Sequence, residues 1–250
     1  MPSPKANAIR AMKGREKIAA LTVYDFAMAQ MLDQLGVPLL LVGDSLGMVV
    51  LGYEDTTHVT MAEMEHHVRA AARAKPRALL AADLPFQSYE TTTQAVQSAQ
   101  RLIAAGAEAV KAEGGKDILP QVQAIVAAGI PFLGHLGMLP QHVREEGGYH
   151  IKGKTVPERE HLLQEAKTLE AAGAFAIVLE LVTPPVAREI SENISIPTIG
   201  IGSGKQCDGQ ILVTTDLWGT SPNYIPKHVK ARLEIPEHMR SAVAEWKKSL

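Results

Sequence analysis

One unit recurs along this chain and limits the folds that it can adopt. A helix-forming stretch ends at small residues and a glycine, a short apolar run follows, and a polar residue stands where that run ends. The glycines of four such units are Gly36, Gly106, Gly129 and Gly173, and the polar residues that follow them are Asp44, Lys111, His135 and Glu180. A glycine that ends a helix and leads into a strand is half of a repeating strand–helix unit. The pattern therefore predicts an α/β protein.

The number of apolar runs narrows the architecture further. The predicted strands are Ala19–Val23, Leu39–Gly43, Ala78–Ala82, Ala107–Lys111, Pro131–Gly134, Phe175–Glu180, Pro197–Gly200 and a run near Ile211–Thr214. Eight strands, nearly all followed by helical segments, favour a closed (β/α)8 TIM barrel over a doubly wound open sheet, which more often has about five or six strands. A chain of 250 residues suits one such barrel. We expect residues 1–250 to form a single catalytic domain behind a short helical lead-in around Ile9–Met12.

Net charge and apolar patterning argue against nucleic acid and membranes as binding partners. The formal net charge of −2 gives no reason to expect nucleic acid or an anionic membrane. No apolar run reaches the roughly 18 residues of a membrane span, and no apolar segment of a signal peptide follows the basic N-terminal residues. The single cysteine, Cys207, cannot form an internal disulfide and fits a reducing compartment. These features fit a protein of a reducing compartment and give no sign of nucleic-acid binding or of a membrane span.

Local signals predict the segments between the strands. Thr60 followed by Glu63 is the pattern of a capping box, so a helix is expected to begin there after a long loop over Gly47–Thr60. The polar, glycine-rich segment Gly147–Lys154 is expected to be a loop. A last helix is expected over Pro236–Lys248.

Acidic residues stand at or just past the ends of three predicted strands, at Asp44, Asp83 and Glu113. In a barrel these strand ends meet at one mouth. Lys111 lies two residues before Glu113, so in extended chain both side chains point to the same side. Three carboxylates without a cysteine cluster favour a hard cation such as Mg2+, which keeps water ligands and accepts a chelating substrate. The alternative is that these acids cap helices or pair with lysines at the rim.

Two further polar residues are candidates for the chemistry. Glu180 ends an apolar strand, and a carboxylate in such surroundings suits a general base near neutral pH. The alternative is a glutamate that pairs with a nearby Lys or Arg. His135 lies between Gly134 and Gly137, and glycines permit the close approach of a ligand or of backbone. A lone histidine is also often a hydrogen-bonded structural residue.

A glycine-rich segment over Gly200–Lys205 follows the seventh predicted strand. It matches neither the Walker A loop of nucleoside triphosphatases nor the dinucleotide-binding pattern, because the spacing of its residues differs from both. Backbone N–H groups at this point of a barrel often bind anions. A tight turn that packs against the rim explains the segment equally well.

Several stretches resemble the ketopantoate hydroxymethyltransferase (3-methyl-2-oxobutanoate hydroxymethyltransferase) family and follow that family's order. They are Leu21–Asp25, Leu41–Val50, Asp83–Tyr89, Ala109–Gly115, Gly134–Gln141, Gly147–Tyr149, Gly153–Lys154, Gly200–Gly204 and Cys207–Gln210. The most specific is the segment from Val42 to Met48. The chain departs from the common pattern at Ala112, at Leu139 and in the tail after Gly219. The changes at the first two positions leave every candidate site residue in place.

The resemblance implies a Mg2+-dependent barrel enzyme, a transferase of pantothenate and coenzyme A biosynthesis. It implies that a hydroxymethyl group passes from 5,10-methylenetetrahydrofolate, the co-substrate, to 3-methyl-2-oxobutanoate through a Mg-stabilised enolate, giving 2-dehydropantoate. By similarity, the metal-binding residues are Asp44, Asp83 and Glu113; the residues that bind the oxo acid are Asp44, Ser45, Asp83 and Lys111; the proton acceptor is Glu180; and the further pocket residues are Tyr24 and His135. The resemblance also implies a cytoplasmic homo-oligomer, often a decamer.

Two other functions remain open on the sequence. A Mg2+-dependent lyase or aldolase acting on another 2-oxo acid would use the same enolate chemistry without folate. The second alternative is a barrel that has lost catalysis and serves as a binding protein. Such a chain would be expected to lose its strand-end acids, and here they are all present.

Overall fold

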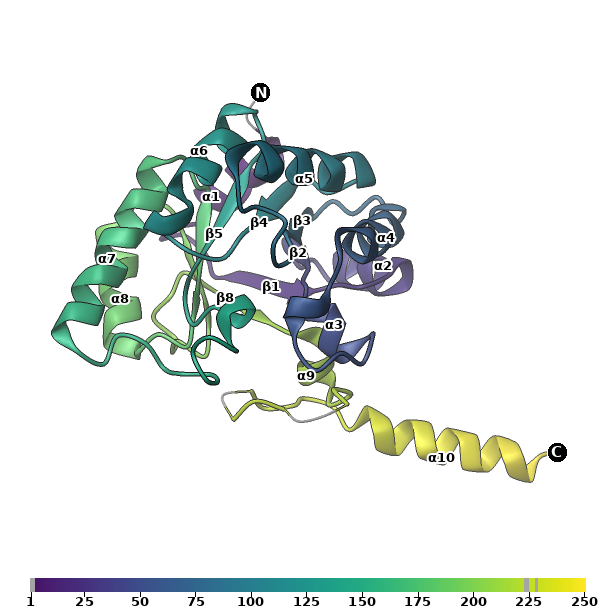
Figure 1. Cartoon of the computed structure of the whole chain (residues 1–250). Helices are drawn as coiled ribbons and strands as arrows, with labels where there is room; N and C mark the ends of the chain where they lie inside the picture. The colour runs from purple at the N-terminus through teal and green to yellow at the C-terminus, as the bar shows by residue number, and fades with distance from the viewer. Residues whose placement is uncertain (1–2, 223–224, 228) are drawn as a thin grey trace.

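Eight parallel strands close into a barrel in the computed structural model, which describes residues 3–222, 225–227 and 229–250 (Figure 1). Each strand pairs with the next, and the first pairs with the eighth. The strands are β1 Ile18–Thr22, β2 Leu39–Val42, β3 Leu79–Asp83, β4 Ala109–Lys111, β5 Phe132–Gly137, β6 Ala176–Glu180, β7 Thr198–Ile201 and β8 Gly209–Leu212. The predicted (β/α)8 barrel is confirmed, and the open sheet is excluded.

Helices connect the strands and cover the outside of the barrel (Figure 1). They are α1 Pro4–Ala11, α2 Phe26–Gln34, α3 Leu46–Val49, α4 Met61–Ala72, α5 Thr92–Ala105, α6 Leu119–Ala127, α7 Val156–Ala171, α8 Pro184–Asn193, α9 Thr214–Trp218 and α10 Ile235–Lys248, with 3-10 turns η1 Thr56–His58, η2 Lys116–Ile118 and η3 Pro140–His142. The segment expected to be a loop over Gly47–Thr60 contains most of α3 and all of η1, and α9 was not expected. Helices this short have too few turns to show an apolar period in the sequence.

The four glycines of the repeated unit all adopt the left-handed conformation. Their φ angles are +77° at Gly36, +114° at Gly106, +79° at Gly129 and +98° at Gly173. A residue with a Cβ pays for this conformation in steric strain, whereas glycine does not. Gly106 also allows close packing, since a Cβ built there would lie 2.4 Å from Cβ of Ala72 on α4. The glycines therefore end helices in the way that the sequence pattern predicts.

The expected capping box opens α4. The Thr60 side chain accepts a hydrogen bond from the Glu63 backbone N–H, and the Glu63 carboxylate accepts one from the Thr60 backbone N–H at 2.7 Å. These bonds satisfy donors that the first turn of a helix would otherwise leave free. The start of α4 is thus set by two local residues.

Strand residues alternate between two separate cores. Leu39 and Leu41 point into the barrel, whereas Leu40 and Val42, one step along the same strand, pack against the surrounding helices. All four are buried, because both faces of a parallel sheet in a barrel are covered. This explains why the strands appear in the sequence as continuous apolar runs rather than as alternating patterns.

Helix α1 closes one end of the barrel. Its buried residues Ala6 and Ile9 belong to the same apolar cluster as the inward-pointing strand residues. The Lys5 ammonium donates to the backbone carbonyls of Pro76 and Ala78, just before β3. With the amino ends of the strands covered in this way, a ligand reaches the barrel from the carboxyl ends.

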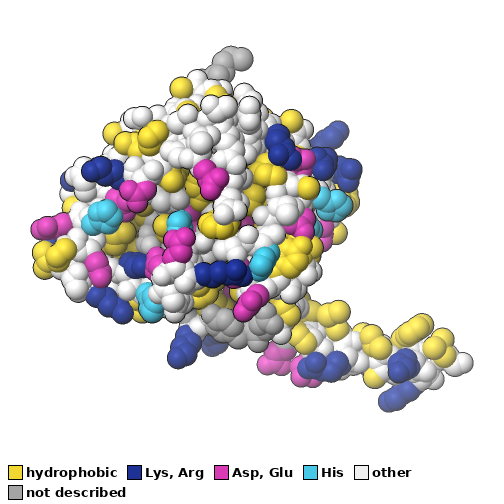
Figure 2. Space-filling model, in the orientation of Figure 1, with side chains coloured by type: hydrophobic (Ala, Val, Ile, Leu, Met, Phe, Trp, Pro, Cys, Tyr) yellow, Lys and Arg dark blue, Asp and Glu magenta, His cyan; other side chains and the backbone are white. Residues whose placement is uncertain are grey.

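Helix α10 extends away from the barrel (Figure 1). None of its residues is buried, and the exposed large apolar side chains along it are Met239, Val243 and Trp246. Their spacing of four and three residues puts them on one edge of the helix, and Figure 2 shows hydrophobic side chains, in yellow, along this helix at the lower right. The assignment of residues 1–250 to one catalytic domain stays a prediction. Among the described residues, we find no helix with the length and apolar character needed to cross a bilayer.

Candidate active site

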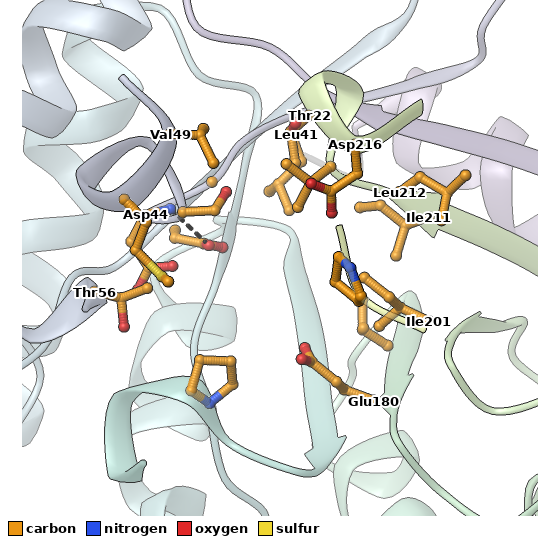
Figure 3. Close-up of a pocket in the computed structure, with 18 of the residues that line it drawn as sticks. Thr22, Leu41, Asp44, Val49, Thr56, Glu180, Ile201, Ile211, Leu212 and Asp216 are labelled. Atoms are coloured by element: carbon orange, nitrogen blue, oxygen red, sulfur yellow. Dashed lines mark hydrogen bonds between the residues drawn. The ribbon is translucent and has the colours of Figure 1, made fainter. Parts of the chain in front are cut away.

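The carboxyl ends of five neighbouring strands deliver polar side chains to one cavity of about 350 Å3. Its lining includes Asp44 after β2, Asp83 at the end of β3, Lys111 and Glu113 from β4 and its loop, His135 on β5 and Glu180 at the end of β6. Figure 3 shows Asp44 on one side of this cavity and Glu180 on another. The structure therefore brings together the acids, the lysine and the histidine that the sequence places at strand ends.

Asp44, Asp83 and Lys111 are in direct contact. The Asp44 backbone N–H donates to Asp83 Oδ2 at 3.1 Å, the bond drawn as a dashed line in Figure 3. Lys111 Nζ lies 3.0 Å from Asp83 Oδ1, and their side chains are only 5% and 4% exposed. The parallel register of β3 and β4 pairs Asp83 with Lys111 directly. Strand pairing thus fixes the ion pair at the bottom of the mouth.

Gln141, in η3 after β5, ties two of the carboxylates together. Its backbone N–H donates to Glu113 Oε2 at 2.9 Å, and its side-chain amide donates to Asp44 Oδ2 at 2.7 Å. The Tyr89 hydroxyl donates to the Gln141 side-chain oxygen at 2.5 Å. The segment containing Gln141 was noted in the sequence, but the residue was given no role, because nothing local shows that one amide reaches two distant acids.

His135 bridges Lys111 and Glu180. Its Nδ1 lies 3.1 Å from Lys111 Nζ, and its Nε2 lies 3.3 Å from Glu180 Oε2. An ammonium can only donate, so Nδ1 accepts and the ring proton belongs on Nε2, facing the carboxylate. Burial and the positive charge of Lys111 lower the pKa of His135, so the ring stays neutral at pH 7. Glu180 is less enclosed than its neighbours, with 17% of its side chain exposed.

Ser45 and Tyr24 lie on the β1–β2 side of the site. Ser45 lines the cavity, and the Tyr24 hydroxyl lies 3.0 Å from Ser45 Oγ. Tyr24 itself is buried behind the cavity wall, and burial raises the pKa of its hydroxyl. His67 Nδ1 contacts the Tyr24 carbonyl at 2.6 Å, a supporting role that the sequence did not reveal. Among the described residues, Ser45 lines the cavity and Tyr24 contacts it from behind.

Carboxyl groups outnumber cationic side chains among the described residues of the site, and their crowding shifts several pKa values. Burial and the neighbouring charge of Asp83 raise the pKa of Asp44 to about 7. Burial, followed by the charge of Asp44, raises the pKa of Glu113 well above its usual value. Burial alone would lower the pKa of Lys111, but the charges of Asp83, Glu113 and Asp44 outweigh it and raise that pKa. One ammonium does not balance these carboxylates, so the cavity favours an added cation.

The donor set fits a hard divalent cation. It consists of carboxylate oxygens, and Glu113 Oε1 is buried without a hydrogen-bond partner among the described residues. No cluster of three or more His, Cys, Asp or Glu ligands is already assembled in the described part of the chain. Mg2+ requires no such cluster, because it commonly binds one or two carboxylates and completes its shell with water and substrate. Asp44 and Asp83, joined by a hydrogen bond, supply such a pair.

The glycine-rich segment after β7 is a packing turn. Ser203 is fully buried, its hydroxyl donates to the Leu179 carbonyl at 2.7 Å and it accepts from the Val182 N–H at 2.9 Å. A Cβ built on Gly204 would lie 2.8 Å from Pro184 Cβ. These contacts attach the turn to β6 and α8, and they favour the packing interpretation over an anion site.

A fifth acid lines the cavity and was not predicted. Asp216 lies on α9 after β8, is 6% exposed and points into the cavity from the side opposite Asp44 (Figure 3). The Ser221 hydroxyl donates to its carboxylate. Its charge also contributes, after burial, to the raised pKa of Tyr24. No local pattern indicated a role for Asp216, because α9 was not expected.

The family model described as Ketopantoate hydroxymethyltransferase matches residues 4–250. Two curated proteins named 3-methyl-2-oxobutanoate hydroxymethyltransferase are similar over most of their length. The one from Syntrophus aciditrophicus (strain SB) is 48% identical over 243 residues, 96% of this chain and 89% of that protein. The one from Ignicoccus hospitalis is 49% identical over 235 residues, 94% of this chain and 89% of that protein.

Solved structures share the fold at low identity. A putative phosphonomutase from Burkholderia cenocepacia J2315 aligns with a TM-score of 0.68 at 14% identity, over 98% of both chains. A phosphonopyruvate hydrolase in complex with oxalate and Mg2+ aligns with a TM-score of 0.63 at 16% identity, over 85% of this chain and 81% of that one. At this level of identity the likeness concerns the barrel alone.

Proposed function

The chain belongs to the ketopantoate hydroxymethyltransferase family, and from this membership we propose the reaction in full. The enzyme transfers a hydroxymethyl group to 3-methyl-2-oxobutanoate and forms 2-dehydropantoate, a step of pantothenate biosynthesis. The one-carbon donor is 5,10-methylenetetrahydrofolate. The observation that carries this proposal is the convergence of Asp44, Asp83, Lys111 and Glu180 on one cavity.

We propose that Asp44 and Asp83 hold Mg2+, with Glu113 in the same metal shell. The support is the excess of carboxylate charge, the raised pKa of Asp44 and the partnerless Glu113 oxygen. Bound there, Mg2+ would polarise the 2-oxo group and offset the negative charge that appears when the substrate loses a proton. Its binding would also displace protons from carboxylates whose pKa is raised.

The substrate carboxylate and oxo group lie, in this proposal, against Asp44, Ser45, Asp83 and Lys111. The Lys111 ammonium is a buried cation beside the proposed metal ligands, and in this proposal it faces the developing charge on the oxo acid. Tyr24 keeps the Ser45 hydroxyl in place. These residues bind and orient the oxo acid, so that its C3–H bond points to the base.

Glu180 is the proposed base. Its carboxylate takes the proton from C3, and the electron pair of the broken C–H bond becomes the nucleophile. The neutral His135 ring, whose Nε2 lies 3.3 Å from Glu180 Oε2, would limit the positions open to the carboxylate. C3 then forms a bond to the one-carbon unit of the donor, tetrahydrofolate leaves, and water supplies the oxygen of the new hydroxyl group.

Two assays on the purified enzyme test the function. With the oxo acid alone in D2O, exchange at C3 reports on proton removal. With 5,10-methylenetetrahydrofolate added, formation of 2-dehydropantoate reports on transfer. Exchange without any transfer would indicate a lyase or aldolase for another 2-oxo acid, and loss of both would indicate a barrel without catalysis.

Removal of the metal tests the carboxylate site. We expect dialysis against EDTA to abolish both exchange and transfer, and added Mg2+ to restore them. Mg2+ should also raise the thermal unfolding midpoint of the depleted protein, because a ligand that binds only the folded state stabilises it. Full activity after metal depletion would contradict the proposed roles of Asp44 and Asp83.

We also propose that the enzyme is cytoplasmic and works as a homo-oligomer, a decamer by family resemblance. The support for assembly is the apolar edge of α10, formed by Met239, Val243 and Trp246, since contiguous exposed apolar side chains commonly mark protein interfaces.

A further inference from the structure

The cavity extends beyond the groups that the proposed chemistry uses. Asp44, Asp83, Lys111 and Glu113 lie on the β2–β4 side, and Glu180 lies at the end of β6. Apolar side chains of β7, of β8 and of described residues after α9 line much of the other side of the cavity, together with Asp216, Ser221 and Lys227. The apolar side chains on that side include Ile201, Leu212, Val213, Pro222 and Pro226. This space is lined for a flat, largely apolar group adjacent to the oxo acid.

Asp216 is the carboxylate of this apolar region. It is almost fully buried and lines the cavity at the start of α9, and it is the one cavity-lining acid, among the described residues, to which neither metal binding nor proton removal gives a role. A carboxylate at the wall of an apolar pocket is costly unless donors face it. The Ser221 hydroxyl is one such donor, and a carboxylate accepts several hydrogen bonds.

We propose that Asp216 binds the reduced pterin ring of the one-carbon donor. This inference rests on the function proposed above, which requires a tetrahydrofolate to lie beside the oxo acid. The pterin ring presents a ring N–H and an exocyclic amino group on the same edge, and these two parallel donors match the two oxygens of a carboxylate. The ring faces would then lie against the apolar side chains of β7 and β8.

The position of Asp216 suits this role. In Figure 3 the Asp216 and Glu180 carboxylates both face the cavity, from the β8 and β6 sides. A ring held at Asp216 would therefore occupy the same cavity as the oxo acid whose proton Glu180 removes. Lys227 lines the same cavity and is exposed, so its ammonium could pair with the acidic glutamyl tail of a folate bound there. In this arrangement the pterin end of the donor would face Asp216 and its acidic tail would face Lys227.

The substitution Asp216→Asn tests the proposal, since it keeps the shape of the side chain and replaces one acceptor by a donor. We expect KM for 5,10-methylenetetrahydrofolate to rise by about 10- to 100-fold, in line with the loss of a charged hydrogen-bond pair. The KM for 3-methyl-2-oxobutanoate and the rate of C3 exchange without folate should stay within about twofold of wild type. The matched control is Asp117→Asn, an exposed acid in η2 after β4, which should change neither KM.

The remaining outcomes are distinct. An unchanged KM for the donor in the Asp216→Asn enzyme would overturn the proposal. A parallel loss of C3 exchange would also overturn it, because Asp216 would then support the oxo acid or the metal. Direct binding of tetrahydrofolate, measured by calorimetry, should weaken by the same factor as KM rises. If the wild-type enzyme exchanged C3 but never used the folate donor, the proposed function would fail before this inference was tested.

Discussion

Lys111, His135 and Glu180 form a continuous chain of contacts across the bottom of the cavity. Lys111 is also paired with Asp83, so one strand-end lysine connects the proposed metal site to the proposed base. A neutral histidine in the middle of this chain can hold Glu180 without competing for its proton. The geometry separates charge stabilisation at Lys111 from proton removal at Glu180.

The first prediction concerns Glu180. In Glu180→Gln, C3 deuterium exchange should fall by about 10²- to 10⁴-fold, because the amide cannot accept the proton. Calorimetry should show that the oxo acid still binds in the presence of Mg2+. The control is Glu145→Gln, an exposed acid after η3. Exchange at the wild-type rate in Glu180→Gln would remove this residue from the base role.

The second prediction concerns Gln141, which joins Asp44 and Glu113 through hydrogen bonds. Gln141→Ala should weaken Mg2+ binding by about 10- to 100-fold, because groups that orient metal ligands contribute at that level. A Mg2+ titration of activity should show recovery at high metal concentration. Gln164→Ala, on the exposed face of α7, is the control. Unaltered Mg2+ dependence would mean that Gln141 only packs.

At the scale of elements, the helix-ending glycines set where one unit stops and the next begins. The third prediction is that Gly106→Ala lowers the free energy of unfolding by about 2–4 kcal/mol, from its positive φ and from the clash with Ala72. Gly14→Ala is the matched control, because Gly14 also has a positive φ but has nothing within 4 Å of an added Cβ. It should cost about 1–2 kcal/mol. Equal losses in urea unfolding would show that packing at Gly106 is unimportant.

Elements that depend on local chemistry could be predicted from the sequence. The Thr60 capping box and the helix-ending glycines act within a few residues and lie where expected. The apolar runs form strands, but β4 begins two residues later than predicted, at Ala109, and β8 begins two residues earlier, at Gly209. Strand β5 is longer than predicted, since Pro131–Gly134 was expected and Phe132–Gly137 is observed. The glycines around His135 interrupt the apolar pattern, so the sequence predicts a short strand there. Pairing with β6 continues to Gly137 and makes the observed strand longer.

The parts of the site that were missed depend on tertiary contacts. Gln141 reaches acids on two other strands, and Asp216 lies on a helix of five residues that has no visible period. Tyr24 was placed in the pocket, but it is held behind Ser45. Which side chain faces a cavity at a loop depends on the path of the chain, and no local pattern records that path.

At the scale of the molecule, α10 is the part that the barrel leaves uncovered. The fourth prediction is that Trp246→Glu reduces the assembled mass in sedimentation velocity, because large aromatic residues dominate interfaces. The control is Lys247→Glu, the adjacent residue, outside the apolar edge of α10. An unchanged mass for Trp246→Glu would mean that this edge is not an interface between copies.

Closure of β1 onto β8 leaves the described sheet without an outer strand. In an open sheet, the amide and carbonyl groups of the outermost strand can template a neighbouring molecule and seed fibres. Here the backbone of each strand is already matched on both flanks, so a folded copy offers nothing to such growth. Conversion to fibres would first require the barrel to open. The closed barrel therefore protects its apolar strands from pairing with strands of other copies.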